Sequence, residues 1–376
     1  MRVQTQLIEM YQPSVLHFGE GALSKLTAWV DERGFSKPFV VADTVNARRI
    51  SSLGLKNVAV FGTVKPEPDV PNLMSAVAEA EVAGADLVIG FGGGSAMDLA
   101  KLVAVMIGQG VSLQDISGPN RAPQRRVGLV QIPTTSGTGS EAGTRALITD
   151  PETHNKIATE SPYMLADMTI IDPVLTQSVP PMVTAATGID ALAHCVEAFT
   201  SKRAHPLIDG YAVQGIELVG SYLKRAVRDG NDIEARAGLA LAAYYGGICL
   251  GPVNTTAGHA VAYPLSTRYG IPHGLANALI FPHTLAANAP AVWEKTQIIC
   301  RALGFSVATP TPDEVRAGAR GFCEDLGLAM DLRSHDVRKE SLSAMAAEAS
   351  GIRRLLDWNP VDLSPNNIEE LYLAAW

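Results

Sequence analysis

Segments with strand character alternate with segments of helical spacing through the first half of this 376-residue chain. Short apolar runs, rich in β-branched residues or bounded by glycine, occupy 38–43, 57–62, 86–94 and 127–135. Apolar residues recur at helical spacing in 72–84 and 95–108. Such alternation connects neighbouring strands by helical crossovers, which makes the strands parallel and covers the sheet with helices. We therefore expect an α/β domain that contains a parallel sheet.

The second half of the chain predicts helices almost throughout. Apolar residues recur at helical spacing after about Pro180, most clearly in 182–201, 207–227 and 233–251. Two adjacent prolines, Pro180 and Pro181, separate this half from the first. The chain is also too long for one ordinary core. We therefore expect two domains, an α/β domain over 1–179 and an all-helical domain over 180–376.

The composition excludes several classes of protein. Hydrophobic residues make up 47% of the chain and charged residues 18%, which is typical of a globular fold. The net charge of -8 argues against nucleic-acid binding through the phosphate backbone. The four cysteines form no CxxC pair, so neither a disulfide framework nor a zinc–cysteine site is expected. With no signal-peptide core and no apolar run of about 18 residues, we expect a cytoplasmic protein without membrane contact.

A glycine-rich segment joins a predicted strand to a predicted helix, and it reads GFGGGSAMDLAK (90–101). Glycines there let the backbone and the helix N-terminus approach a pyrophosphate, and Ser95 adds a hydroxyl group. The usual dinucleotide fingerprint has an acidic residue about 20 residues after the glycines. In this chain the better carboxylate, Asp43, precedes them. Without a ligand, the glycines would form a tight turn and Asp43 would be a turn aspartate.

A carboxylate and three imidazoles form a candidate metal site. Asp190 and His194 are four residues apart, which places both on one face of a helix. His259 and His273 follow in an alanine- and glycine-rich region with few other polar groups. Such a set suits a divalent first-row metal and leaves a position open for substrate. Taken singly, each element has a simpler interpretation. Asp190 and His194 could form a surface hydrogen bond, His259 could be a core histidine, and His273 could be a turn residue. His283 is a weaker candidate ligand.

Four segments together resemble the iron-containing (group III) alcohol dehydrogenases of the dehydroquinate synthase-like fold. They read GGGSAMDLAK, PTTSGTGSE, GIDALAHCVEA and HAVAYPLSTRYGIPHGLANA, and the resemblance covers about 11–289. It implies an oxidoreductase that transfers hydride between NAD(H) and a small alcohol, aldehyde or ketone. It also implies a divalent metal, Fe²⁺ or else Zn²⁺, that polarises the substrate oxygen. We further expect a homo-oligomer, in its simplest form a dimer.

The resemblance assigns roles to individual residues. The implied metal ligands are Asp190, His194, His259 and His273. The implied pyrophosphate loop contains Gly92, Gly93, Gly94 and Ser95, and the cofactor cleft is lined by Asp98, Thr134, Thr135 and Thr138. Asp43 matches the position that discriminates the ribose, which favours NAD(H) over NADP(H). Lys156 matches a lysine near the nicotinamide.

One departure from the family pattern concerns proton transfer. Many relatives carry a further histidine four residues after the third ligand, and this chain has Tyr263 there. A helical spacing of four residues still places the tyrosine beside His259. Either Tyr263 or solvent would then relay the proton.

Two arginines bear on the substrate. Arg145 follows the PTTSGTGSE segment, and Arg268 lies between two of the implied ligands. Either guanidinium could bind a carboxylate, phosphonate or sulfonate group on the substrate. Alternatively, both arginines form ordinary salt bridges.

Three other functions remain as alternatives. A metal-free reductase like the maleylacetate reductases would not need the intact aspartate–histidine set. A dehydroquinate synthase-like lyase would need a lysine- and arginine-rich site that this chain lacks. A non-catalytic binding protein would need neither the ligand set nor both cofactor segments.

Overall fold

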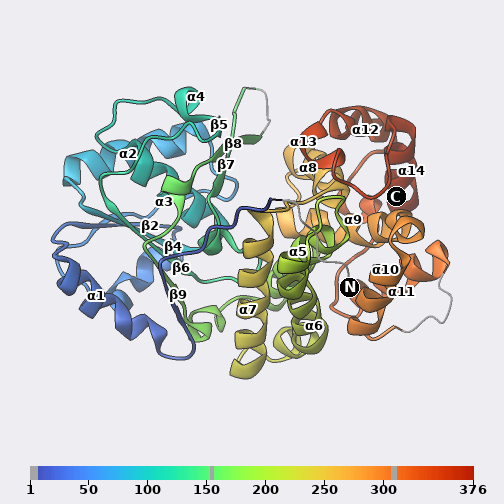
Figure 1. The fold of residues 1–376 in the computed structure, drawn as a ribbon, viewed down its shortest axis with the longest axis horizontal. Helices are drawn as coiled ribbons and strands as arrows, with labels where there is room; N and C mark the ends of the chain where they lie inside the picture. Colours follow the sequence, from blue (N-terminus) through green and yellow to red (C-terminus); the bar gives the residue numbers. More distant parts are fainter. Residues whose placement is uncertain (1–6, 153–155, 306–310) are drawn as a thin grey trace. The chain divides into compact units, whose positions relative to one another are not determined.

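The computed structural model describes residues 7–152, 156–305 and 311–376. Contacts between residues divide the chain into two compact units. One contains Met10–Thr135 and Gly139–Ser178, and we call it the sheet unit (Figure 1). The other contains Val179–Trp376 together with Ser136–Thr138 and a short N-terminal segment, and we call it the helical unit.

A six-stranded sheet forms the centre of the sheet unit. Its strand order is β1-β9-β6-β4-β2-β3, and every neighbouring pair is parallel. The strands are β1 (Val15–Phe18), β2 (Pro38–Ala42), β3 (Ala59–Phe61), β4 (Leu87–Gly92), β6 (Gly128–Pro133) and β9 (Met168–Ile171). The predicted parallel sheet is therefore confirmed.

Helices cover both faces of this sheet because alternate residues of each strand point to opposite sides. On one face, Phe39, Val41 and Val88 pack in a core with α2 (Val70–Ala83) and α3 (Gly94–Met106). On the other, Val40 and Ile89 pack with α1 (Lys25–Arg33) and the 3-10 segment η2 (Asn46–Leu53). Strands buried on both faces explain the continuous apolar runs of the sequence.

A smaller sheet in the same unit was not anticipated. It contains β5 (Gly118–Pro119), β7 (Arg145–Thr149) and β8 (Lys156–Glu160), and β7 pairs with β8 in an antiparallel arrangement. In β7 only Ala146 and Ile148 are buried, and they alternate with partly exposed residues. Strands this short, with a charged residue at one end in β7 and at both ends in β8, give little strand signal in the sequence. The unit also contains the short helix α4 (Leu113–Ile116).

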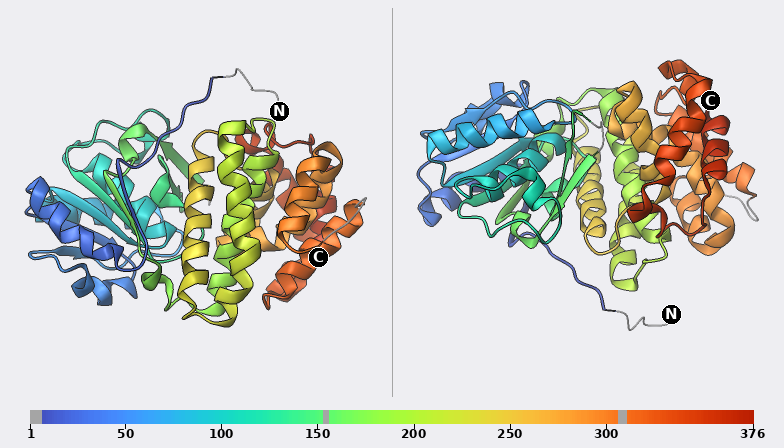
Figure 2. Two further views of the ribbon diagram at one scale, coloured as in Figure 1. Left: turned by 60° about the horizontal axis from the view of Figure 1, so that its bottom comes forward. Right: turned by 90° about the horizontal axis from the view of Figure 1, so that it is seen from above.

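Within the described residues, the helical unit contains helices and no strand. They are α5 (Pro181–Thr200), α6 (Pro206–Arg228), α7 (Ile233–Leu250), α8 (Ala257–Tyr269), α9 (His273–Asn288), α10 (Trp293–Ala302), α11 (Pro312–Glu324), α12 (Leu342–Ser350), α13 (Arg353–Leu356) and α14 (Pro365–Ala375). Helix α5 packs against α6, α7 and α9, and Figure 2 shows α5, α6 and α7 side by side. No helix in the described ranges has the length and apolarity needed to cross a membrane.

Small residues allow these helices to approach one another closely. Gly215 of α6 faces the Cys195 side chain of α5, and a Cβ at Gly246 of α7 would lie 3.1 Å from the His194 Cβ. Cys195 is fully buried, and burial raises the pKa of its thiol to about 12. This cysteine therefore acts as a packing residue and not as a nucleophile.

Candidate metal and dinucleotide sites

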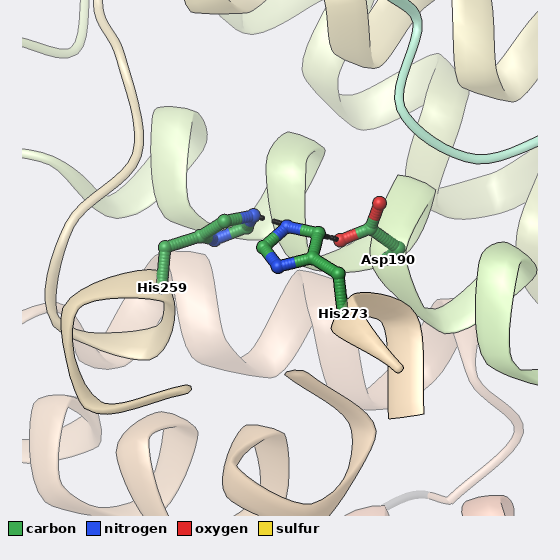
Figure 3. Close-up of side chains that lie close together, drawn as sticks. All are labelled: Asp190, His259 and His273. Atoms are coloured by element: carbon green, nitrogen blue, oxygen red, sulfur yellow. Dashed lines mark ion pairs between the residues drawn. The ribbon is translucent and has the colours of Figure 1, made fainter. Parts of the chain in front are cut away.

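Three helices of the helical unit bring a carboxylate and two imidazoles together. Asp190 lies in the middle of α5, His259 in the first turn of α8, and His273 at the first position of α9. The Asp190 Oδ1 atom is 3.6 Å from the Nε2 atoms of both histidines. One potential ligand atom from each residue lies within 4.8 Å of the other two. Figure 3 shows the three side chains together, with dashed lines that mark the ion pairs of the two rings with the carboxylate.

The spacing of these atoms fits a divalent cation. Two ligand atoms about 2.1 Å from a zinc-like ion at a tetrahedral angle are roughly 3.4 Å apart. The observed separations of 3.6 Å are close to that value. Asp190 and His259 are almost fully buried, and buried charge of this kind is usually paired or bound to metal. The donor set therefore fits the metal that the sequence analysis predicts.

His194 lies next to this group and is not part of the tightest set. Its Nε2 atom is 3.9 Å from Asp190 Oδ1, and its ring stacks on His259 with the centroids 4.7 Å apart. Its buried Nδ1 atom has no hydrogen-bond partner among the described residues. Burial lowers the pKa of His194 to about 4, so the imidazole is neutral at pH 7, as a metal ligand must be.

The charges of the buried cluster compensate one another. Burial alone would raise the pKa of Asp190, but His194, His273 and His259 hold it well below its usual range. Burial alone would lower the pKa of His259, but the carboxylates of Glu197 and Asp190 raise it to about 10. Each of these two shifts comes from opposite charge at short range. A divalent cation at Nε2 would replace the proton of His259 and supply the positive charge to Asp190, so His259 would bind it as neutral imidazole.

Asn277 is a residue of this site that the sequence analysis missed. It is buried in α9, four residues after His273. Its Nδ2 atom is 2.7 Å from Asp190 Oδ1 and 3.2 Å from the Nε2 atoms of His259 and His273. The spacing of four residues from a predicted ligand was the available signal.

Tyr263 lies beside the same histidines. Its ring stacks on His273, with the centroids 5.8 Å apart, and meets the His259 ring edge-on at 6.5 Å. The residue is buried in α8. The structure thus puts a hydroxyl-bearing ring next to the candidate metal ligands.

In the sheet unit, the predicted pyrophosphate loop joins a strand to a helix. Strand β4 ends at Gly92, Gly93 is the N-cap, and α3 begins at Gly94 followed by Ser95. A Cβ at Gly92 would lie 2.8 Å from the Ala96 Cβ and 3.2 Å from Asp43 Oδ2. No side chain fits there without displacing its neighbours, which explains the glycine at the end of β4. Gly93, Gly94 and Ser95, at the N-terminus of α3, are partly exposed.

Asp43, Asn46 and Thr134 meet beside this loop. Asp43 Oδ1 accepts hydrogen bonds from the backbone amides of Val45 (2.8 Å) and Asn46 (2.9 Å). Its Oδ2 accepts one from Asn46 Nδ2 at 2.7 Å, and Nδ2 also lies 3.2 Å from Thr134 Oγ1. Asp43 therefore makes the turn contacts of the simpler interpretation and also faces Gly92. Asn46 was missed, because asparagine after a strand reads as an ordinary turn residue.

The other predicted cofactor-lining residues have identifiable neighbours. Asp98 accepts hydrogen bonds from Ser140 Oγ (2.5 Å) and the Leu147 amide (2.9 Å), which anchors the PTTSGTGSE segment to α3. Thr135 Oγ1 lies 3.2 Å from where a Cβ at Gly93 would be. Thr138 belongs to 136–138, which is grouped with the helical unit.

The positively charged candidates are all paired with glutamates. Lys156 forms an ion pair with Glu67 and a hydrogen bond of 2.8 Å with Thr149 Oγ1. Arg145 Nη2 is 2.7 Å from Glu160 Oε2. Arg268 Nε is 2.7 Å from Glu348 Oε2. Arg145 and Arg268 thus form the ordinary salt bridges that the sequence analysis gave as the alternative to substrate binding. An acidic group on the substrate would have to share either guanidinium group with a glutamate.

Comparison with known proteins identifies the family. Two family models match the chain, iron-containing alcohol dehydrogenase over residues 13–173 and the C-terminal part of the Fe-containing alcohol dehydrogenase family over 184–376. The chain is 36% identical to long-chain-alcohol dehydrogenase 1 of Geobacillus thermodenitrificans, covering 97% of this chain and 95% of the relative. It is 32% identical to the sulfoacetaldehyde reductase of Bilophila wadsworthia, with 95% and 96% covered.

Solved structures agree with this assignment. A 1,3-propanediol oxidoreductase matches with a TM-score of 0.92 and 29% identity, covering 99% of this chain and 100% of the other. The sulfoacetaldehyde reductase from Bifidobacterium kashiwanohense in complex with NAD⁺ matches with a TM-score of 0.88 and 28% identity, covering 98% and 99%. The predicted resemblance and fold class are therefore confirmed, and the chain belongs to the iron-containing alcohol dehydrogenase family.

Proposed function

We propose that this protein is a metal-dependent, NAD(H)-linked oxidoreductase that interconverts a small alcohol and its aldehyde or ketone by hydride transfer. The convergence of donor atoms from Asp190, His259 and His273 carries this proposal. In it, residues 1–179 bind the dinucleotide, and residues 180–376 bind metal and substrate. We also propose a cytoplasmic homo-oligomer, with the dimer as its simplest form.

The candidate metal ligands would hold the cation and leave a side open to substrate. Asp190 supplies negative charge, and His194, His259 and His273 supply neutral nitrogen donors. When bound, a divalent ion, Fe²⁺ or else Zn²⁺, supplies Lewis acidity that polarises the substrate oxygen. Tyr263 lies against the rings of His259 and His273, where its hydroxyl group can pass a proton to or from solvent.

The dinucleotide would be held mainly by the sheet unit. Backbone amides of Gly92, Gly93 and Gly94, with the Ser95 hydroxyl, face the pyrophosphate at the N-terminus of α3. Asp43 accepts from the ribose hydroxyls, and Asp98, Thr134, Thr135 and Thr138 line the cofactor. Lys156 lies toward the nicotinamide. A solved relative that binds NAD⁺ supports this cofactor.

The alternative functions have weaker support. A metal-free reductase of the maleylacetate reductase type has no use for three converging ligand atoms. A dehydroquinate synthase-like lyase would need a site rich in lysine and arginine, and the sequence offers no such site.

A panel of short aldehydes and alcohols, followed by the NADH absorbance, tests the proposal. The protein loaded with Fe²⁺ or Zn²⁺ should reduce at least one short aldehyde, lose this activity on chelation, and regain it when the metal is restored. Metal content is measured on the same samples. Undiminished turnover after complete removal of metal would contradict a metal-dependent reaction.

A substrate with an acidic group is the second candidate, because one relative at 32% identity is a sulfoacetaldehyde reductase. We expect Arg145→Ala to raise KM for sulfoacetaldehyde about tenfold more than for propionaldehyde, since a hydrogen bond to a charged group contributes about 1.5–3 kcal/mol. Arg268→Ala, which breaks the exposed pair with Glu348, tests the second candidate guanidinium in the same way. Equal changes in both KM values for Arg145→Ala would assign Arg145 to its ion pair with Glu160 alone.

A further inference from the structure

A histidine that binds a metal through Nε2 needs its proton on the other ring nitrogen. The two neutral tautomers of imidazole are close in energy, so the partner of Nδ1 decides which nitrogen keeps its lone pair. Partners of this kind also fix the orientation of the ring. If His259 binds the metal, as the proposed function requires, the partner of its Nδ1 atom has this role.

Glu197 is the partner of His259. Its Oε1 atom is 2.6 Å from His259 Nδ1, and both side chains are less than one-tenth exposed. Glu197 lies on α5, seven residues after Asp190, and is thus two helical turns along the same helix. One helix therefore carries both the carboxylate that faces Nε2 of His259 and the carboxylate that faces its Nδ1.

The second oxygen of Glu197 is held by the start of α8. Oε2 accepts hydrogen bonds from the Thr256 amide (2.6 Å), the Thr256 hydroxyl group (3.2 Å) and the His259 amide (3.3 Å). The first amides of a helix have no partner within the helix, and the helix dipole favours negative charge there. These contacts compensate the buried carboxylate and leave it little freedom to turn away from the imidazole.

Gly258 makes room for this arrangement. A Cβ at this position would lie 2.6 Å from Glu197 Oε1 and 2.9 Å from its Cδ. Any side chain at 258 would push the carboxylate away from His259. The glycine immediately before the candidate ligand is therefore explained by the close approach of Glu197.

We propose that Glu197 is a positioning residue for metal binding. It keeps the proton of His259 on Nδ1, turns Nε2 toward Asp190, and holds the ring before the cation arrives. His194 differs, because its Nδ1 atom has no partner among the described residues. Of the two stacked rings, therefore, only His259 has a charged partner that orients it for metal binding.

The test is the affinity for Zn²⁺ alone, measured by competition with a chromophoric chelator. Glu197→Gln keeps the size of the side chain but places an amide NH₂ group against either the imidazole N–H or the helix amides. We expect the dissociation constant for Zn²⁺ to rise about 10–100-fold, as for other residues that orient a metal-binding histidine. Asp209→Asn is the matched control, since Asp209 pairs with Lys295 in the same unit and should leave the affinity unchanged.

The outcomes separate this inference from the proposed function. Unchanged Zn²⁺ affinity in a folded Glu197→Gln variant would show that Glu197 only ties α5 to α8. Absence of Zn²⁺ binding to the unmodified protein would instead contradict the proposed function. If Glu197→Gln does not fold, the unmodified zinc-loaded protein with ¹⁵N-labelled histidine decides the matter. His259 should then keep its proton on Nδ1, and zinc bound through Nδ1 would overturn the inference.

Discussion

Replacing His259 or His273 by alanine should empty the metal site and lower kcat/KM by about three orders of magnitude or more. Each imidazole supplies one of three ligand atoms that lie within 4.8 Å of one another. Loss of one leaves the buried Asp190 carboxylate with less compensating charge and the cation with too few donors. Lewis-acid stabilisation contributes several kcal/mol to the transition state, and each 1.36 kcal/mol is about tenfold in rate.

Metal analysis and dinucleotide titration on the same variants check this expectation. Metal content should fall well below that of the unmodified protein, whereas NADH binding should persist because the glycine loop lies in the sheet unit. His335→Ala is the matched control, since His335 is a partly exposed histidine of the helical unit that bonds only the Ala329 carbonyl among the described residues. A His259→Ala variant with full metal content and near-normal kcat would show that the ligand assignment is wrong.

The sequence predicted the four adjacent strands β2, β3, β4 and β6 of the main sheet, whereas β1 and β9 were not predicted. All six residues of Leu87–Gly92 and of Gly128–Pro133 are buried, and both segments are apolar apart from Gln131. The antiparallel pair β7 and β8 could not be predicted in the same way. Arg145, Lys156 and Glu160 occupy these short strands, and charged residues on partly exposed edges resemble a loop.

The candidate metal site was only partly accessible to sequence reasoning. A spacing of four residues places Asp190 and His194 on one face of α5, but it says nothing of how far apart their ligand atoms lie. The convergence of His259 and His273 on Asp190 comes from the packing of α8 and α9 against α5, which no local pattern specifies. The resemblance to a family supplied that information instead.

Glu197 and Asn277 escaped notice for a related reason. A glutamate or an asparagine inside a helix is ordinarily a solvent-facing residue. Their burial, at 6% and 2% exposure, becomes evident only when the helices are packed. Glu197 lies three residues after His194, and Asn277 lies four residues after His273. Such spacings make helical neighbours, and they were the only local signal.

Asp43→Gly should reduce the preference for NADH over NADPH about 10–100-fold and could reverse it. The carboxylate faces the glycine loop, with Oδ2 3.2 Å from where a Cβ at Gly92 would be. It would repel a 2′-phosphate and accept from the ribose hydroxyls. A hydrogen bond to a charged group contributes about 1.5–3 kcal/mol, which gives the expected range.

The same carboxylate also supports the turn, so a second variant must separate the two roles. Asp43 Oδ1 accepts from the amides of Val45 and Asn46, and Asp43→Gly loses these bonds together with the charge. Asp43→Asn keeps an oxygen for the two backbone amides and removes the charge, together with the hydrogen bond that Oδ2 accepts from Asn46 Nδ2. Both variants should therefore shift the ratio of kcat/KM for NADH and NADPH in the same direction, while Zn²⁺ affinity stays unchanged. Equal kcat/KM for both cofactors in the unmodified protein would assign Asp43 to the turn alone, because a carboxylate beside the ribose cannot be indifferent to a second phosphate.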